Sequence, residues 1–324
     1  MKMTKFRKIL LSILIPLFII TVIFFYVYNS PENQIKRKIE AVITAQESLK
    51  ADLDIITVQD YERFNFEMTQ LDKLMDKEDF SLEGVDIKGI SKNDEKLAGE
   101  LELFEDKIGQ CKDQLEALDL EPEKYTEKYY GLLQKLNRSL DILSYFSANY
   151  RQALSMDKVI MDDFEKFALS EGQDMILKPL ERYYKQAKAF KNMFVTSLNS
   201  SITEFNALNG KKAEIVETKP QEKDIKTIMD NLASKNYKIL GRITEDLDGD
   251  PADELVVLSA TPDGTIVEIY DFKNNAYEKI WENNIGKTPA KNLFARYYSL
   301  MPEVVVLPGG ASFKYNGKEY KMTL

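Results

Sequence analysis

Apolar side chains recur with heptad spacing between residues 33 and 209, where glycine and proline are sparse. The clearest stripe consists of Leu97, Leu101, Phe104, Ile108, Cys111, Leu115 and Leu118. A stripe of this kind is a narrow seam that must be buried against another helix. The region therefore predicts an elongated antiparallel helical bundle of roughly four or five helices. An intermolecular coiled coil, which would make the protein a homo-oligomer, is the alternative that the pattern leaves open.

The heptad pattern is interrupted near residues 57–60, at 81–93, at 119–122 and around Gly172. Gly84 and Gly89 fall in the second interruption and Pro122 in the third, and both residue types are typical of connections between helices. We therefore expect helices to end at these places. The only cysteine, Cys111, occupies a seam position, so we expect it to be a buried small hydrophobic residue rather than a reactive thiol.

The apolar pattern changes its period after a polar segment at 210–223, which we interpret as a linker. Residues 224–234 predict a short amphipathic helix. Strands are then predicted at 237–243, 255–259, 265–272, 277–281 and 303–307. The sequences Pro262-Asp263-Gly264 and Tyr315-Asn316-Gly317-Lys318 are typical of tight turns between paired strands. Residues 224–324 therefore predict a small, mostly antiparallel β domain, and the chain as a whole is predicted to be α+β.

Residues 9–28 contain no charged side chain, and a membrane-spanning helix needs about 20 apolar residues. Lys2, Lys5, Arg7 and Lys8 precede this segment. Under the positive-inside rule they place residues 1–8 in the cytoplasm and the bulk of the chain outside it. We therefore predict a single-pass transmembrane signal-anchor in the cell membrane. A cleaved signal peptide is the alternative, but the apolar segment is longer than such peptides use and no Ala-x-Ala site follows it.

The composition excludes several kinds of chemistry, because the chain contains no histidine and a single cysteine. Ser-His-Asp and Cys-His catalysis cannot occur within this chain, and a structural zinc site is not expected. Any metal site must consist of oxygen ligands. The net charge of −9 argues against nucleic acid as a partner, because phosphate binding requires a basic surface.

Residues 246–254 read Asp-Leu-Asp-Gly-Asp-Pro-Ala-Asp-Glu and are followed directly by the predicted strand at 255–259. Carboxylates at alternate positions of a tight loop converge on one point, and a hard cation relieves their repulsion. The expected ligands are the side chains of Asp246, Asp248, Asp250 and Glu254 and the backbone carbonyl of Ala252. This set predicts a calcium site with a structural role. A solvated acidic turn without an ion is the other interpretation.

The loop is not an EF-hand, because Val257 stands where that motif has its bidentate glutamate. The run Asp-Leu-Asp-Gly-Asp-x-x-Asp-Glu-Leu-Val-Val instead resembles the calcium loop of FG-GAP or VCBS-type repeats, the four-stranded blades of integrin-like propellers and of many bacterial surface proteins. The resemblance covers residues 237–281 and implies that calcium is held by the five positions named above. Two departures stand out: Pro251 replaces the usual glycine, and only one clear repeat is present.

These features predict an anchored extracytoplasmic interaction or scaffold module that contacts a protein or a component of the cell envelope through a calcium-stabilised β domain. An accessory ligand sensor is an alternative, although residues 1–8 are too few for a signalling output. A hydrolase based on paired carboxylates is a weaker alternative, since no motif selects one pair of acids. No catalytic residue and no organic cofactor site is therefore predicted.

Overall fold

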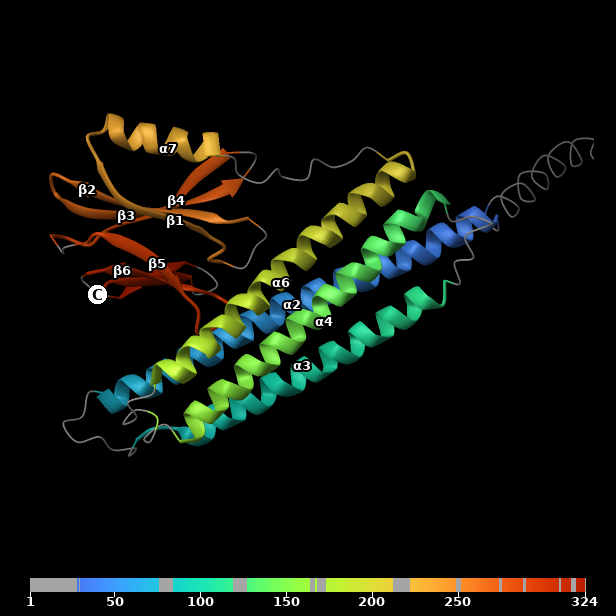
Figure 1. The fold of residues 1–324 in the computed structure, drawn as a ribbon, viewed down its shortest axis with the longest axis horizontal. Coiled ribbons are helices and arrows are strands. Elements are labelled where there is room, and N and C mark those ends of the chain that lie inside the picture. The colour runs from blue at the N-terminus through green and yellow to red at the C-terminus, as the bar shows by residue number, and fades with distance from the viewer. Residues whose placement is uncertain are drawn as a thin grey trace, which may run out of the picture.

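The computed structural model describes residues 28, 30–75, 84–118, 127–163, 167, 173–211, 222–248, 252–273, 276–287, 290–308, 310–315 and 319–323. Five helices and two antiparallel sheets are present among these residues, with the long helices first and the strands last along the chain. The predicted α+β class is thus confirmed (Figure 1).

Four long helices lie side by side, and each runs back along the one before it (Figure 1). They are α2 (Pro31–Met75), α3 (Ile87–Glu116), α4 (Glu127–Asp162) and α6 (Gln173–Leu208). We call these four helices the bundle. Buried aliphatic and aromatic side chains from all four form one core, which includes the seam that begins at Leu97. Cys111 is buried in this core as predicted, and its burial raises the pKa of the thiol to about 11.

Helix α2 is one continuous helix, so the break predicted at 57–60 is wrong. The helix begins at Pro31 after Ser30, whose hydroxyl accepts a hydrogen bond from the Asn33 amide at 3.4 Å. Within the expected break, the Thr57 hydroxyl donates to the Leu53 carbonyl at 2.8 Å. Asp60 is fully buried. Thr57 and Asp60 therefore face the interior of the protein and do not mark a loop.

Helix α3 begins at Ile87, earlier than the predicted connection at 81–93 allows. Asp86 is its N-cap, and the Asp86 side chain accepts a hydrogen bond from the Gly89 amide at 2.9 Å. The cap and Phe66 leave no room for a side chain at Gly89 within the helix: an added Cβ would lie 2.8 Å from the Phe66 ring. The predicted connections at 119–122 and around Gly172 lie outside the described residues.

A network of buried charges surrounds Arg63 near one end of the bundle. Its guanidinium lies 3.2 Å from Asp60, 2.7 Å from Glu67 and 3.6 Å from Asp94, and it also forms an ion pair with Asp157. These residues come from α2, α3 and α4. Helix α6 contributes Tyr184, whose hydroxyl accepts a hydrogen bond from Arg63 at 2.5 Å. We call this group the Arg63 network.

The C-terminal region contains α7 (Glu222–Ser234) and two four-stranded sheets. The first sheet is formed by β1 (Lys238–Glu245), β2 (Glu254–Thr261), β3 (Gly264–Lys273) and β4 (Ala276–Asn284). The second sheet is formed by β5 (Asn292–Arg296), β6 (Glu303–Leu307), β7 (Ser312–Tyr315) and β8 (Tyr320–Thr323). In each sheet the strands follow chain order and neighbours are antiparallel. We call residues 222–323 of the described chain the β domain.

Each predicted strand overlaps an observed one, and the prediction at 303–307 coincides with β6. The turn before Gly264 joins β2 to β3 as expected. The φ of Gly264 is 146°, a backbone conformation that glycine adopts without strain. The predicted hairpin near the C-terminus corresponds to the pairing of Tyr315 with Tyr320. Strand β5 was not predicted, because its short sequence lacks a run of alternating apolar residues.

The two sheets face each other across a shared apolar core, and α7 covers the other face of the first sheet (Figure 1). The connection from β5 to β6 packs against the bundle instead, because Tyr297 and Leu300 belong to the core of the four helices. The β domain is therefore docked on the bundle and does not stand apart from it.

No helix within the described part of the chain combines the length and the apolar character needed to cross a membrane. Residues 9–27 of the predicted anchor at 9–28 lie outside the described residues. The anchor therefore stays a prediction from the sequence.

Candidate metal centre

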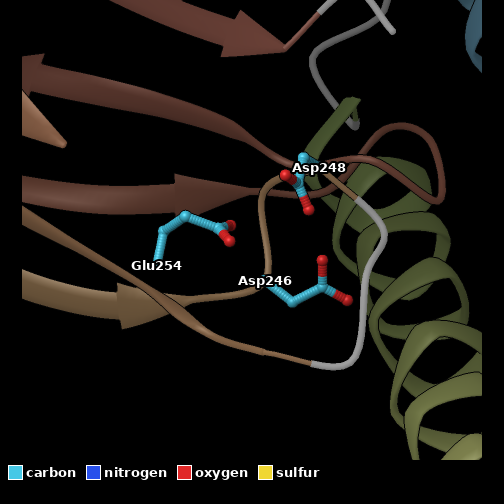
Figure 2. A group of neighbouring side chains, drawn as sticks. All are labelled: Asp246, Asp248 and Glu254. Atoms are coloured by element: carbon cyan, nitrogen blue, oxygen red, sulfur yellow. The ribbon is translucent and has the colours of Figure 1, made fainter. Parts of the chain in front are cut away.

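Three of the predicted ligands meet at one end of the first sheet. Asp246 follows β1, Asp248 lies in the loop, and Glu254 opens β2 opposite Glu245. Leu247 between the two aspartates is buried in the core between the sheets, which fixes the loop against the domain. Figure 2 shows that the three carboxylates approach a common space from different sides.

The spacing of these carboxylates suits a single cation. One oxygen from each of Asp246, Asp248 and Glu254 lies within 4.8 Å of the other two. Calcium binds oxygen at about 2.4 Å, so two ligands on opposite sides of one ion are at most about 4.8 Å apart. An all-carboxylate set is also the donor chemistry that a hard divalent cation prefers. The described residues could therefore hold a hard divalent cation, and for calcium they would supply part of the six to eight oxygens that this ion takes.

Burial makes the cluster costly without a compensating positive charge. Asp246 and Glu254 are 0 % exposed, and Asp248 is half-buried. Glu254 also closes the loop, because its side chain accepts a hydrogen bond from the Leu247 amide at 2.5 Å. Transferring carboxylates from water to the protein interior is unfavourable unless protons, lysines or a metal ion neutralise them.

A further buried acid lies beside the cluster. The register aligns Leu255 with Tyr270, which places Asp271 of β3 next to Glu254 across the ladder. Asp271 is 0 % exposed and accepts no hydrogen bond from the described residues, although it forms an ion pair with Lys273. Like charges opposite each other on paired strands repel. The strands thus bring a fourth carboxylate to the edge of the candidate centre.

Tyr320 of β8, in the second sheet, lies near the cluster. Its side chain is 8 % exposed, and its hydroxyl makes no hydrogen bond to any described residue. Burial raises the pKa of the phenol well above its usual value, and the charges of Glu254, Asp248 and Asp271 raise it further. A buried hydroxyl that lies among carboxylates without bonding to a described residue is a polar group available to a bound ion or its water.

The bundle also contributes to the site through Lys188 of α6. Its ammonium donates a hydrogen bond to the backbone carbonyl of Asp246 and lies 3.3 Å from Asp246 Oδ1. Lys188 is nearly completely buried. The helix beside the three carboxylates in Figure 2 is α6. The candidate metal centre therefore lies at the junction between the β domain and the bundle.

The sequence prediction identified Asp246, Asp248 and Glu254, which the structure brings together. Ala252 is described in the segment before β2, and Asp250 lies outside the described residues together with Pro251. The residues that sequence reasoning missed are Lys188, Asp271 and Tyr320. Asp271 carried a recognisable signal, because it shares the alternating positions of the inward-facing Val267 and Ile269.

A groove of about 350 Å³ lies between α3 and α4, and polar side chains form part of its walls. Glu105 accepts hydrogen bonds there from Ser147 and from Arg151, the latter at 2.5 Å. These groups bind each other, so they hold α3 against α4 and present no arrangement that selects a ligand.

The chain was compared with protein-family models, curated proteins and solved structures, and no match was found in any of the three. The resemblance to a calcium-loop repeat therefore depends on the loop residues alone. The chemistry of the site follows from its oxygen ligands, its burial and its position at the junction.

Proposed function

We propose that the chain is a membrane-anchored, extracytoplasmic interaction or scaffold protein in which the bundle holds a calcium-stabilised β domain in a fixed position. The observation that carries this proposal is the junction between the two parts. A carboxylate cluster of the β domain, suited to a divalent cation, lies directly against the buried Lys188 of the bundle. The candidate cation site therefore lies within the contact between the two domains.

The docking contacts support a rigid arrangement. Leu300 packs in the bundle core, and its backbone amide donates to Asp60 of α2 at 2.7 Å. Lys314 of β7 donates to Asn65 of the same helix at 2.5 Å. Buried apolar contacts together with buried polar contacts restrict rotation of one domain on the other.

The length of α2 gives the bundle the role of a spacer. At about 1.5 Å per residue, Asp60 lies about 44 Å along the helix from Pro31. The predicted anchor at 9–28 immediately precedes this helix. An anchored chain would therefore hold its β domain tens of ångströms from the membrane surface, where the domain contacts a protein or envelope partner.

The proposal gives the cation a structural role. A catalytic metal keeps an open coordination position for water or substrate. Asp246 and Glu254 are fully buried, and this burial favours a structural ion over one that binds a substrate. Neutralising buried carboxylates at the junction is the contribution that this geometry supports.

Calcium titration calorimetry on the full-length chain in detergent micelles tests the cation site. We expect binding of about one equivalent, which Asp248→Asn weakens by tenfold or more, because a buried site loses one of its charged ligands. Asp263→Asn is the matched control, since Asp263 is an exposed acid in the turn before β3. Unchanged binding in Asp248→Asn, or equal losses in both variants, would contradict the assigned site.

Cysteine labelling of intact cells tests the topology. In a Cys111→Ala background, Leu103→Cys places the only thiol at a side chain that is 60 % exposed on α3. We expect a membrane-impermeant maleimide to label this variant on intact cells and to leave the background unlabelled. Labelling that requires permeabilised cells would place the bundle in the cytoplasm and refute the proposed location.

A further inference from the structure

A cation from the protein already lies beside the candidate metal centre. Lys188 donates to the Asp246 carbonyl and lies 3.3 Å from one of its carboxylate oxygens. Both residues are almost fully buried, so little water screens their interaction. The two residues belong to different domains and lie 58 positions apart in the chain.

A second buried lysine strengthens the positive field of α6. Lys191 donates to Thr57 of α2 at 3.2 Å and lies 3.5 Å from Asp54. Burial lowers the pKa of Lys191, while the charge of Asp246 raises it and that of Lys188 lowers it. The field of this helix at Asp246 is therefore set first by Lys188, which contacts it, and then by Lys191.

A divalent ion bound by Asp246, Asp248 and Glu254 would share Asp246 with the Lys188 ammonium. Two cations held by one carboxylate at short range repel each other, and burial increases that repulsion. Tyr320 of the second sheet instead brings a buried hydroxyl near the cluster, a group that can bind an ion rather than repel it. Lys188 is thus the group placed to oppose the ion.

We propose that Lys188 sets the cation affinity of the β domain: the lysine and a divalent ion compete for Asp246, so that ion binding and docking of the β domain on α6 oppose each other. This inference rests on the proposed function, because it assumes a divalent site in the loop. Coupling between two binding events is reciprocal. An undocked β domain binds the ion more tightly, and a bound ion weakens docking by the same factor.

The test is calcium titration of the full-length chain in micelles with Lys188→Met. Methionine fills a similar volume without the charge, and we expect the affinity for calcium to rise on the order of tenfold. Lys178→Met is the matched control, because it removes a lysine that is exposed on the same helix. We expect a change of less than about twofold there, since exposed charges are screened by water and salt.

Loss of the lysine leaves Asp246 without this buried partner, so Lys188→Met is expected to be less stable in the absence of calcium. The calcium-induced rise in unfolding temperature is measured within each variant, so it can be compared between proteins that differ in stability without calcium. We expect the rise to be larger in Lys188→Met than in the wild type, because the variant binds the ion more tightly. An equal or smaller rise would overturn the proposal.

Hydrogen exchange tests the docking half of the inference. The Leu300 amide is bonded to Asp60 across the junction, so its exchange reports undocking. Saturating calcium is expected to speed exchange of this amide in the wild type and to have a smaller effect in Lys188→Met. Slower exchange with calcium would show that the ion tightens the junction and would refute the competition.

The outcomes separate this inference from the proposed function. Calcium binding by the wild type with no change in Lys188→Met refutes the competition and leaves the metal site intact. Binding only in Lys188→Met supports the competition and refutes a calcium-loaded wild-type protein, because the lysine then occupies the site itself. Absence of binding in both proteins overturns both proposals.

Discussion

Asp60 of α2 accepts a 2.7 Å hydrogen bond from the backbone amide of Leu300, a residue 240 positions later in the chain. Asp60 also accepts hydrogen bonds from Tyr150, at 2.9 Å, and from Arg63, at 3.2 Å. Burial raises the pKa of this carboxyl, and Arg63, Leu300 and Tyr150 each oppose the increase. One carboxylate therefore links the interior of the bundle to the backbone of the β domain.

Replacing Asp60 by asparagine tests this link. The variant keeps the side-chain size but removes the charge that Arg63 and the Leu300 amide bind. We expect a loss of about 3 kcal/mol in the free energy of unfolding, measured by urea denaturation, because a buried partner of an ion pair is removed. Glu62→Gln, at an exposed acid on the same helix, should cost less than about 1 kcal/mol. Equal losses would argue against a special role for Asp60.

The Arg63 network predicts a dependence of stability on pH. Burial and the nearby Asp157 raise the pKa of Glu67 to about 9 despite the opposing charge of Arg63. A carboxyl whose pKa is higher in the folded protein than in the unfolded chain stabilises the fold fully below its unfolded pKa. That contribution is lost as the pH rises from about 4.5 through about 9.

Glu67→Gln copies the protonated form of the side chain. We therefore expect the variant to lose less stability than the wild type between pH 5 and about 9, measured as the urea midpoint across that range. Glu62→Gln, at an exposed position on α2, should retain the wild-type pH profile. The same slope in Glu67→Gln and the wild type would show that Glu67 is already ionised in the folded protein.

Two glycines of α3 predict opposite effects of alanine. At Gly99 an added Cβ meets nothing within 4 Å, so Gly99→Ala should raise stability by up to about 1 kcal/mol through its helix propensity. At Gly89 the Cβ would lie 2.4 Å from Asp86 Oδ2 and would displace the N-cap. Gly89→Ala should therefore be less stable than Gly99→Ala by thermal unfolding. A gain of equal size in both variants would mean that the cap moves at no cost.

Removal of calcium should lower the stability of the full-length chain. A ligand that binds only the folded state stabilises it by about 2.7 kcal/mol when present at 100 times its dissociation constant. A calcium chelator should thus lower the unfolding temperature of the wild type by several degrees and leave that of Asp248→Asn nearly unchanged. Identical curves with and without chelator would remove the structural role assigned to the ion.

The sequence predicted those features that depend on local repetition. Leu101 and Phe104 follow heptad spacing, and they are buried in the bundle as that spacing requires. The strand at 303–307 contains three adjacent valines, which are β-branched, and it coincides with β6. The acids at 246, 248 and 254 meet because the loop that connects two paired strands holds them close together in space.

Features that depend on distant partners could not be predicted in this way. Thr57 and Asp60 resembled a helix break because they are polar, yet they bind Lys191 and Leu300 from other elements. Lys188 likewise has the local sequence of a solvated helix residue, although it is buried and forms an ion pair with Asp246 of the β domain. A polar residue in a helix has the same local sequence whether it faces water or another domain, so only the fold distinguishes the two.

The bond between Asp60 and Leu300 also has a consequence for the order of events during biosynthesis. The ribosome completes all four bundle helices before residue 300 is made, and closing so long a segment of chain costs entropy that later contacts must offset. Until then the hydrogen bond from Leu300 to Asp60 cannot form, although all four helices have been synthesised. The last domain to be made therefore completes the interior of the first, and chains that end before β6 should leave that interior open to water.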